Sequence, residues 1–290
     1  MKYLFIALAV IVIAILLHQE NTILDITEYE ITSGKLRNSK AYTIAHVSDF
    51  HNTHNRTLRA DIIARLKERK PDFIVITGDL IDSRRADIPC ALSFIDEIKD
   101  ISDIYYVIGN HEARRYKKDY AVLEEGLLAR GVHVLHDEQI VIDDTLVITG
   151  IDDLRLLTRS KKLANTWPIV EPKINKLITS EELFNILLIH RPEFTLKYGE
   201  KENLDLVFCG HAHGGQIRVP GIGGLFAPSQ GILPKYTAGC HKIKNTSVII
   251  SRGIGNSLGP FRINDHPELI FAELKEDGSV ARKQQNNQYN

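Results

Sequence analysis

The stretch DFIVITGDLID, at residues 72–82, joins a continuous apolar run to a polar ending that holds Asp79 and Asp82. A short apolar run of this kind, bounded by glycine, is typical of a β-strand that is covered on both faces. The chain repeats this arrangement at YTIAHVSDFH (42–51), IYYVIGNHE (104–112), FNILLIH (184–190) and LDLVFCGHAH (204–213). Because ligands bind outside the carboxyl ends of strands in open α/β sheets, we expect the five polar endings to meet at one sheet edge.

The segments between these runs predict helices that alternate with the strands. Apolar residues recur at helical spacing over residues 58–70, 88–100 and 116–130, and Gly131 closes the third segment. Two β-like runs within residues 133–151 have no helix between them, which predicts a hairpin turning at Asp143 and Asp144. The last third of the chain is rich in strand patterns and glycine, and it predicts a second sheet packed on the first.

The N-terminus differs from the rest of the chain, because residues 3–17 form an unbroken apolar run behind a single Lys2. The run is short for a transmembrane helix, which needs about 20 residues, and long for a signal-peptide core of about 7–15 residues. No A-x-A cleavage pattern or lipobox cysteine follows it, so we expect one uncleaved membrane anchor. A cleaved signal and a buried helix are the alternatives. The basic residue before the run and the acidic residues after it favour a main domain that lies outside the cell membrane.

We divide the chain into four parts on these patterns. Residues 1–20 are the anchor or signal segment, 21–40 a linker with a first strand at 23–32, 41–275 the main domain and 276–290 a polar tail. Within the main domain, residues 154–183 carry the only tryptophan, Trp167, end in a predicted helix and could cover the site.

Composition limits the function classes. The net charge of −1 and the pI near 6.9 argue against a broad nucleic-acid-binding surface, and we expect no nucleic-acid partner. The three cysteines show no C-x-x-C spacing, so we expect no disulfide framework, and Cys209 lies in an apolar run as a small core residue.

The polar endings supply metal-type ligands, namely two carboxylates, one amide and four histidines, with His111 in addition. These candidates are Asp49, His51, Asp79, Asn110, His190, His211 and His213. Mixed nitrogen and oxygen ligands without thiolate suit Mn²⁺, Fe or Zn²⁺ better than Mg²⁺ or Ca²⁺. The number of ligands fits two divalent cations that share a bridging carboxylate. Two such cations lower the pKa of a bridging water and neutralise the oxygens of a phosphate.

The ordered motifs D-F-H, G-D-L-I-D, G-N-H-E, a single His and G-H-A-H resemble those of the calcineurin-like metallophosphoesterase family. The resemblance implies a four-layer α/β/β/α sandwich of two mixed sheets flanked by helices. It also implies one cation on Asp49, His51, Asp79 and His213, and a second on Asp79, Asn110, His190 and His211. His111 would be the catalytic histidine that contacts phosphate and assists the leaving group. Asp82 would orient a ligand or a loop.

Further sequence is similar to the membrane-anchored, bacterial-type branch of that family. The similarity rests on the G-H-A-H-G-G-Q run, the glycine-rich loop at 226–239, S-R-G-I-G-N-S at 251–257 and the apolar N-terminus. It implies a hydrolase of phosphodiester or pyrophosphate linkages that attacks with a metal-bridging hydroxide. The implied substrate is a phosphorylated small molecule or a lipid-linked compound of the UDP-diacylglucosamine type. The alternatives are a protein Ser/Thr phosphatase and a non-catalytic metal-binding scaffold of the same fold.

Two arginines are candidate substrate contacts. Arg114 follows the G-N-H-E motif and Arg252 lies in the glycine-rich C-terminal region. Either guanidinium could bind a phosphate through two hydrogen bonds, and either could be a solvated surface residue. We expect His54 to be a loop residue and Asp152 and Asp153 to have a turn role.

Overall fold

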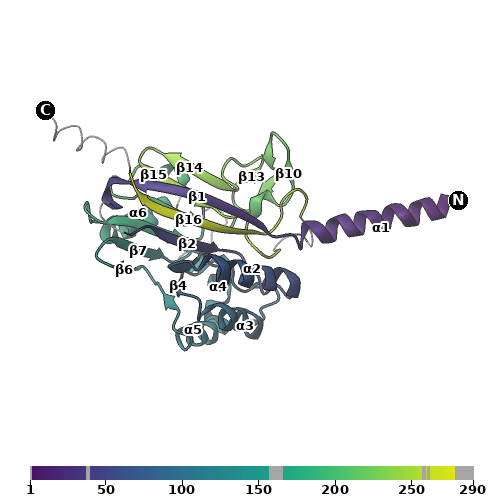
Figure 1. Cartoon of the computed structure of the whole chain (residues 1–290), viewed down its shortest axis with the longest axis horizontal. Coiled ribbons are helices and arrows are strands. Elements are labelled where there is room, and N and C mark those ends of the chain that lie inside the picture. The colour runs from purple at the N-terminus through teal and green to yellow at the C-terminus, as the bar shows by residue number, and fades with distance from the viewer. Residues whose placement is uncertain (1, 37–39, 157–165, 257–258, 260–261, 278–290) are drawn as a thin grey trace.

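Two six-stranded sheets form the centre of the computed structural model, which describes residues 2–36, 40–156, 166–256, 259 and 262–277 (Figure 1). The first sheet has the order β1 (Asp25–Ser33), β16 (Glu268–Glu276), β2 (Tyr42–Val47), β3 (Phe73–Ile76), β4 (Asp103–Tyr106) and β5 (His133–Val134). The second has the order β14 (Gly239–Ile243), β15 (Thr246–Ile250), β9 (Leu206–Cys209), β8 (Phe184–Ile189), β7 (Leu146–Ile151) and β6 (Glu138–Ile142).

Both sheets are mixed, as predicted. In the first sheet, β16 runs antiparallel to β2 and the other neighbouring strands are parallel. In the second, the β14–β15 and β6–β7 pairs are antiparallel and the central pairs are parallel. The β6–β7 pair is the hairpin expected around Asp143 and Asp144.

The two sheets pack face to face through one apolar layer, and helices cover their outer faces. The inner layer includes Ile44 and Val75 of the first sheet and Ile186 and Phe208 of the second. The helices α2 (Arg56–Arg69), α3 (Ile88–Ile98) and α5 (Ala121–Leu128) pack on the first sheet, and α6 (Trp167–Leu177) and α7 (Thr195–Tyr198) pack on the second. The order helix, sheet, sheet, helix confirms the four-layer prediction.

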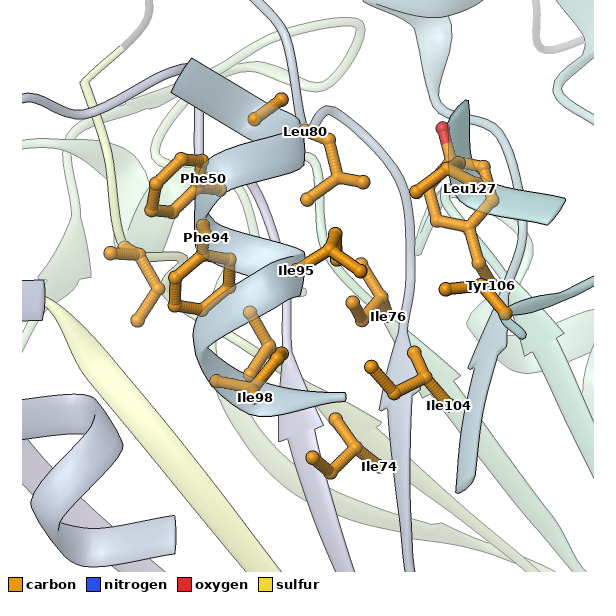
Figure 2. Close-up of a cluster of buried hydrophobic side chains, with 14 of the residues drawn as sticks. Phe50, Ile74, Ile76, Leu80, Phe94, Ile95, Ile98, Ile104, Tyr106 and Leu127 are labelled. Atoms are coloured by element: carbon orange, nitrogen blue, oxygen red, sulfur yellow. The ribbon is translucent and has the colours of Figure 1, made fainter. Parts of the chain in front are cut away.

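Helix α3 shows how the sequence sets this packing. Asp87 caps its N-terminus, because the Cys90 N–H donates to the Asp87 carboxylate at 3.0 Å, and Pro89 lies in the first turn. The buried positions then recur at helical spacing through Phe94 and Ile98. Figure 2 shows these side chains facing the strand residues Ile74, Ile76 and Ile104.

The N-terminal helix α1 (Lys2–Glu20) projects away from the domain (Figure 1). It is about 28 Å long at the usual helical rise, close to the roughly 30 Å of a bilayer's hydrocarbon core. By length and composition it is the one described helix that could cross a membrane. Its C-terminal end is attached to the domain, since Asn256 donates a hydrogen bond to the Asn21 side chain.

Two regions differ from the sequence-based expectation. The helix expected over 116–130 is preceded by α4 (Asn110–Arg115), continues through a π-helical turn (Tyr116–Tyr120) and ends as α5. The G-N-H-E motif therefore begins a helix and not a loop, and the Glu112 side chain caps that helix at the Gly109 N–H. Within 154–183, residues 157–165 lie outside the described residues, and the expected cover over the site falls partly on them.

Candidate metal centre

The five polar endings meet at one end of the two sheets. Asp49 and His51 follow β2, Asp79 follows β3, and Asn110 and His111 open α4 directly after β4. His190 follows β8, and His211 and His213 follow β9. Each of these eight side chains belongs to a residue at most 5% exposed. The fold therefore buries polar groups from both sheets in one place.

The first group of ligand atoms comes from Asp49, His51 and His213. The Asp49 Oδ1 atom lies 3.3 Å from His213 Nε2 and 3.7 Å from His51 Nε2, and the two Nε2 atoms are 3.1 Å apart. Within the described part of the chain, Asp49 Oδ1 is buried without a hydrogen-bond partner. Because a buried carboxylate oxygen without a partner is costly, a cation held by these three side chains would satisfy it.

The second group comes from Asp79, His190 and His211. The Asp79 Oδ2 atom lies 3.3 Å from His190 Nε2, and His190 Nε2 lies 3.1 Å from His211 Nδ1. The same Asp79 oxygen is 3.7 Å from His51 Nε2 of the first group. The carboxylate of Asp79 therefore lies between the two groups, as a bridging ligand would.

Electrostatics hold most of these side chains in the form that binds a cation. Burial lowers the pKa of His213 to about 3 and places the pKa of His211 well below its usual value, so both rings are neutral. Burial raises the pKa of Asp49 and Asp79, but the neighbouring histidines, His213 and His51 at Asp49 and His190 at Asp79, lower it by more, so both carboxyls are ionised. Burial lowers the pKa of His190, yet Asp79 raises it to about 10, so this ring holds a proton that a cation would displace.

The backbone is unusual at five of the candidate ligands. Asp49, His51, Asp79, His211 and His213 all have positive φ, between 48° and 68°. Left-handed backbone costs a non-glycine residue about 1–3 kcal/mol and persists only where the surrounding structure enforces it. This concentration of strained residues at one place is typical of a functional site.

Comparison with known proteins assigns the family. Residues 42–215 match the family described as calcineurin-like phosphoesterase, which is more than half of the chain. The chain belongs to the calcineurin-like phosphoesterase family. It is a metal-dependent hydrolase of phosphoric ester bonds, and the two groups joined at Asp79 form its candidate dinuclear metal site.

Three relatives are similar over most of this chain. An uncharacterized metallophosphoesterase of Aquifex aeolicus is 29% identical over 270 residues, covering 90% of this chain and 96% of its own. The phosphodiesterase YaeI of Escherichia coli is 27% identical over 241 residues, covering 82% and 83%. A transmembrane protein with metallophosphoesterase domain from Danio rerio is 26% identical over 262 residues, covering 87% of this chain and 57% of its own.

In this phosphoesterase, His111 lies beside the carboxylate of Asp79. Its Nε2 atom is 3.9 Å from Asp79 Oδ2, and its backbone N–H donates to Asp79 Oδ1 at 2.8 Å. Its Nδ1 atom lies 2.8 Å from the Ser83 N–H and 3.3 Å from Asp82 Oδ1. When Ser83 donates to Nδ1, the neutral ring carries its proton on Nε2, which faces the metal groups. When the ring is doubly protonated, Nδ1 donates to Asp82 instead, so Asp82 is placed to orient the charged form of His111.

Glu112 positions the loop that carries Asp79, although sequence reasoning assigned it no role beyond its place in the G-N-H-E motif. Its buried carboxylate accepts hydrogen bonds from the backbone N–H groups of Asp79, Ile81 and Gly109, at 2.9, 3.0 and 2.9 Å. Burial and the charge of Asp79 raise the pKa of Glu112 to about 7. These three bonds fix the loop after β3 against the start of α4.

Arg191 is a second site residue that sequence reasoning missed. It is 2% exposed, and its Nε donates to Asp153 Oδ2 at 2.6 Å. The other side of the guanidinium reaches the metal groups, with Nη1 2.8 Å from His211 Nε2 and Nη2 3.3 Å from Asn110 Oδ1. Glu193 Oε1 lies 3.4 Å from the same His211 nitrogen and 3.2 Å from Arg191 Nη1. A charged residue directly after a candidate ligand, in the run LIHRPE, was the available signal.

The two arginines proposed from the sequence have different surroundings. Arg114 is exposed. Burial lowers the pKa of Arg155, and the positive charges of Arg191 and Arg114 lower it further. Arg252 is paired with Glu268 and Asp25 through Nη2, at 3.2 and 3.0 Å. The guanidinium of Arg252 thus forms ion pairs beside β1 and β16, and its contact with substrate stays a prediction.

A cavity of about 600 Å³ opens beside the first group. It is lined by His51 and by the polar residues Asn52, Thr53, His54, Arg85, Asp87 and Asn256, together with Ala86. Its size is within the range of ligand pockets. Because Asn256 is also bonded to Asn21, the cavity opens next to the end of α1.

Proposed function

We propose that this phosphoesterase uses two divalent cations, with manganese as the first candidate, to hydrolyse a phosphodiester or pyrophosphate linkage in a lipid-linked substrate. Compounds of the UDP-diacylglucosamine type have the required chemistry. The observation that carries the reaction class is the position of Asp79 between two buried ligand groups. When bound, the cations would supply the charge that activates water and neutralises phosphate oxygens.

The ligands divide into two sets. Asp49, His51 and His213 would hold the first cation together with Asp79, whose oxygen is 3.7 Å from His51. His190, His211 and Asn110 would hold the second with the same Asp79. The Asn110 Oδ1 atom and His211 Nε2 both contact Arg191, which supports their placement on one side of the centre.

His111 would move the proton that the leaving oxygen needs. Its Nε2 faces the shared carboxylate, while Ser83 and Asp82 hold Nδ1 on the far side of the ring. In its doubly protonated form, with the Nδ1 proton on the side of Asp82, the ring can donate its Nε2 proton to an oxygen in the site, become neutral and take up a proton again from water.

The lipid character of the substrate rests on α1. The helix is long and apolar enough to cross a membrane, and its end is bonded to Asn256 at the cavity that contains His51. An enzyme attached in this way holds its cavity near the bilayer surface. Lipid-linked substrates are located at that surface, so the attachment favours them over soluble ones. The Danio rerio relative described as a transmembrane protein supports a membrane location.

The reaction class is tested by metal analysis and turnover of the same preparations. We expect about two metal ions per chain and turnover of a bis-aryl phosphodiester that a chelator abolishes and Mn²⁺ restores. Asp79→Asn should lower the metal content and abolish turnover, whereas the matched control Asp61→Asn, on the exposed face of α2, should change neither. Retained turnover in pure Asp79→Asn would exclude the shared-carboxylate mechanism. A wild-type protein without metal or turnover would favour the non-catalytic scaffold.

The substrate class is tested by a panel. We expect hydrolysis of a UDP-linked acylated sugar in vesicles to exceed that of a phosphopeptide at equal concentration. A preference for the phosphopeptide would instead indicate a protein phosphatase.

The location is tested by protease treatment of intact cells that express the full chain. We propose a single N-terminal anchor with the domain outside the cytoplasm, so the domain should be digested while cytoplasmic markers survive. Full protection of the domain would reverse this orientation.

A further inference from the structure

The stretch from the start of β9 to the residue before Asp265 has an unusual charge distribution. Residues 206–264 contain no Asp or Glu, although the whole chain has 37 acidic residues. The same stretch has six basic residues, Arg218, Lys235, Lys242, Lys244, Arg252 and Arg262. Arg252 is paired with Asp25 and Glu268 and Arg262 is buried, whereas Lys235, Lys242 and Lys244 are exposed. The exposed charges that this stretch contributes are therefore positive, which favours an anionic partner.

Two short hairpins within this stretch expose large apolar side chains. One pairs β10 (Arg218–Val219) with β11 (Gly223–Gly224), and the other pairs β12 (Phe226–Ala227) with β13 (Gly231–Ile232). Ile222 is 65% exposed, Phe226 45%, Ile232 81% and Leu233 58%. These four exposed apolar residues lie close together in the chain and form a patch. An ordinary surface instead exposes apolar side chains singly and far apart. We call residues 218–236 the hairpin flap.

The hairpin flap is joined to the base of the predicted anchor. The Arg218 N–H donates to the Ile263 carbonyl at 2.9 Å. Asp265, two residues after Ile263 in the chain, donates its N–H to the Glu20 carboxylate at 3.4 Å. Glu20 is the last residue of α1. Figure 1 likewise shows β10 and β13 at the end of the domain from which α1 leaves. A bilayer crossed by α1 would therefore lie next to the hairpin flap.

The flap also borders the metal centre. Gly224 packs against Gly214 and Gly215, which directly follow His213. The Ser229 hydroxyl accepts a hydrogen bond from Arg191 Nη1 at 3.3 Å. A flap seated on the bilayer would thus hold the reaction centre beside the lipid headgroups.

We propose that the hairpin flap lies in the headgroup layer of an anionic phospholipid bilayer, as a second membrane contact beside α1. Ile222, Phe226, Ile232 and Leu233 enter the boundary between headgroups and acyl chains, where exposed apolar side chains lose contact with water. The exposed Lys235 lies next to lipid phosphates. This proposal rests on the membrane anchor of the proposed function, and it adds the orientation of the domain on the membrane.

Quenching of tryptophan fluorescence by brominated lipids tests the contact in the full chain. Trp167→Phe removes the only native tryptophan, and single tryptophans are then introduced as I232W in the flap, I11W in α1 and V141W in β6. Val141 is 50% exposed and is the matched control, because Figure 1 places β6 at the end of the domain away from α1. Each variant is reconstituted in vesicles of phosphatidylcholine and phosphatidylglycerol, with plain or brominated acyl chains.

We expect brominated lipids to quench I232W and I11W and to leave V141W unchanged. Equal emission of I232W in the two kinds of vesicle, with I11W quenched, would overturn the flap contact while the anchor stands. Equal quenching of V141W would also overturn it, because the contact would not be specific to the flap. An unquenched I11W would overturn the anchor and the flap contact together. Turnover of the bis-aryl phosphodiester by each variant reports the catalytic proposal separately.

Discussion

Replacing Arg191 by methionine should destabilise the fold strongly, because it leaves a buried carboxylate without its cation. Arg191 and Asp153 are each 2% exposed, and the Arg191 Nε to Asp153 Oδ2 distance is 2.6 Å. Breaking one partner out of a buried ion pair costs about 3–5 kcal/mol. That is a large part of the roughly 5–15 kcal/mol by which a domain is stable.

A double-mutant cycle separates the ion pair from the loss of packing. Asp153→Asn keeps an oxygen that can accept the Arg155 N–H, which donates to Asp153 at 2.8 Å. In the double variant Arg191→Met/Asp153→Asn no buried charge is left unpaired between these two positions. We therefore expect the double variant to be more stable than Arg191→Met alone, with a coupling energy of about 1–3 kcal/mol.

Urea unfolding of the full chain in detergent micelles measures these free energies through Trp167. This tryptophan packs on Phe194 and Tyr198, and the Tyr198 hydroxyl donates to the Arg191 carbonyl at 2.8 Å, so the reporter is close to the change. An exposed arginine serves as the matched control, and Arg65→Met on α2 should stay within about 0.5 kcal/mol of wild type. A loss below about 1 kcal/mol in Arg191→Met, or no recovery in the double variant, would refute the buried-pair reasoning.

Three further predictions use the site and its supports. His111→Gln should lower the turnover number by about 10²–10⁴ and leave metal content unchanged, as turnover and metal analysis of one preparation would show. A hydrogen bond to Asp152 is the main cause that raises the pKa of His136 to about 9. The protonated His136 ring therefore stabilises the fold fully below pH 6.5, and this stabilisation is lost as pH rises through about 9. The unfolding free energy should therefore fall by about 1–3 kcal/mol over that range, and His136→Gln should remove this slope. Gly210→Ala should cost about 1–3 kcal/mol and reduce metal content, because its Cβ would lie 2.3 Å from the Asp49 carboxylate.

The sequence predicted the parts of the site that depend on short segments. Each candidate ligand follows an apolar run in the chain, and a run that forms a buried strand delivers its next polar residues to the strand end. The presence of two sheets and of the helices that cover them also followed from local patterns. The start of α4 was not predicted. The Glu112 carboxylate caps this helix at the Gly109 N–H and also accepts from the Asp79 N–H in the loop after β3, and this second contact joins segments that are distant in sequence.

The role of Arg191 could not be predicted, because it depends on residues that are distant in sequence. Asp153 was expected to have a turn role, and only the parallel pairing of β7 with β8 brings it beside Arg191. The ion pairs of Arg252 likewise depend on distant residues, since Asp25 and Glu268 come from β1 and β16, two neighbouring strands of the first sheet. A local pattern identifies residues that can bind an anion, but the assembled sheets decide which anion is nearby.

Five candidate ligands have a left-handed backbone conformation, and the residue types at these positions suit both the fold and the chemistry. Asp and His tolerate positive φ better than β-branched or bulky residues do, and both also bind cations. At about 1–3 kcal/mol each, five such residues oppose folding by an amount comparable to the whole stability of a domain. Contacts that do not themselves bind the cations must offset this cost, and the bonds from Glu112 to the loop after β3 are of that kind. The metal centre is therefore held by its surroundings as much as by its ligands, and residues such as Glu112 should be as sensitive to substitution as the ligands are.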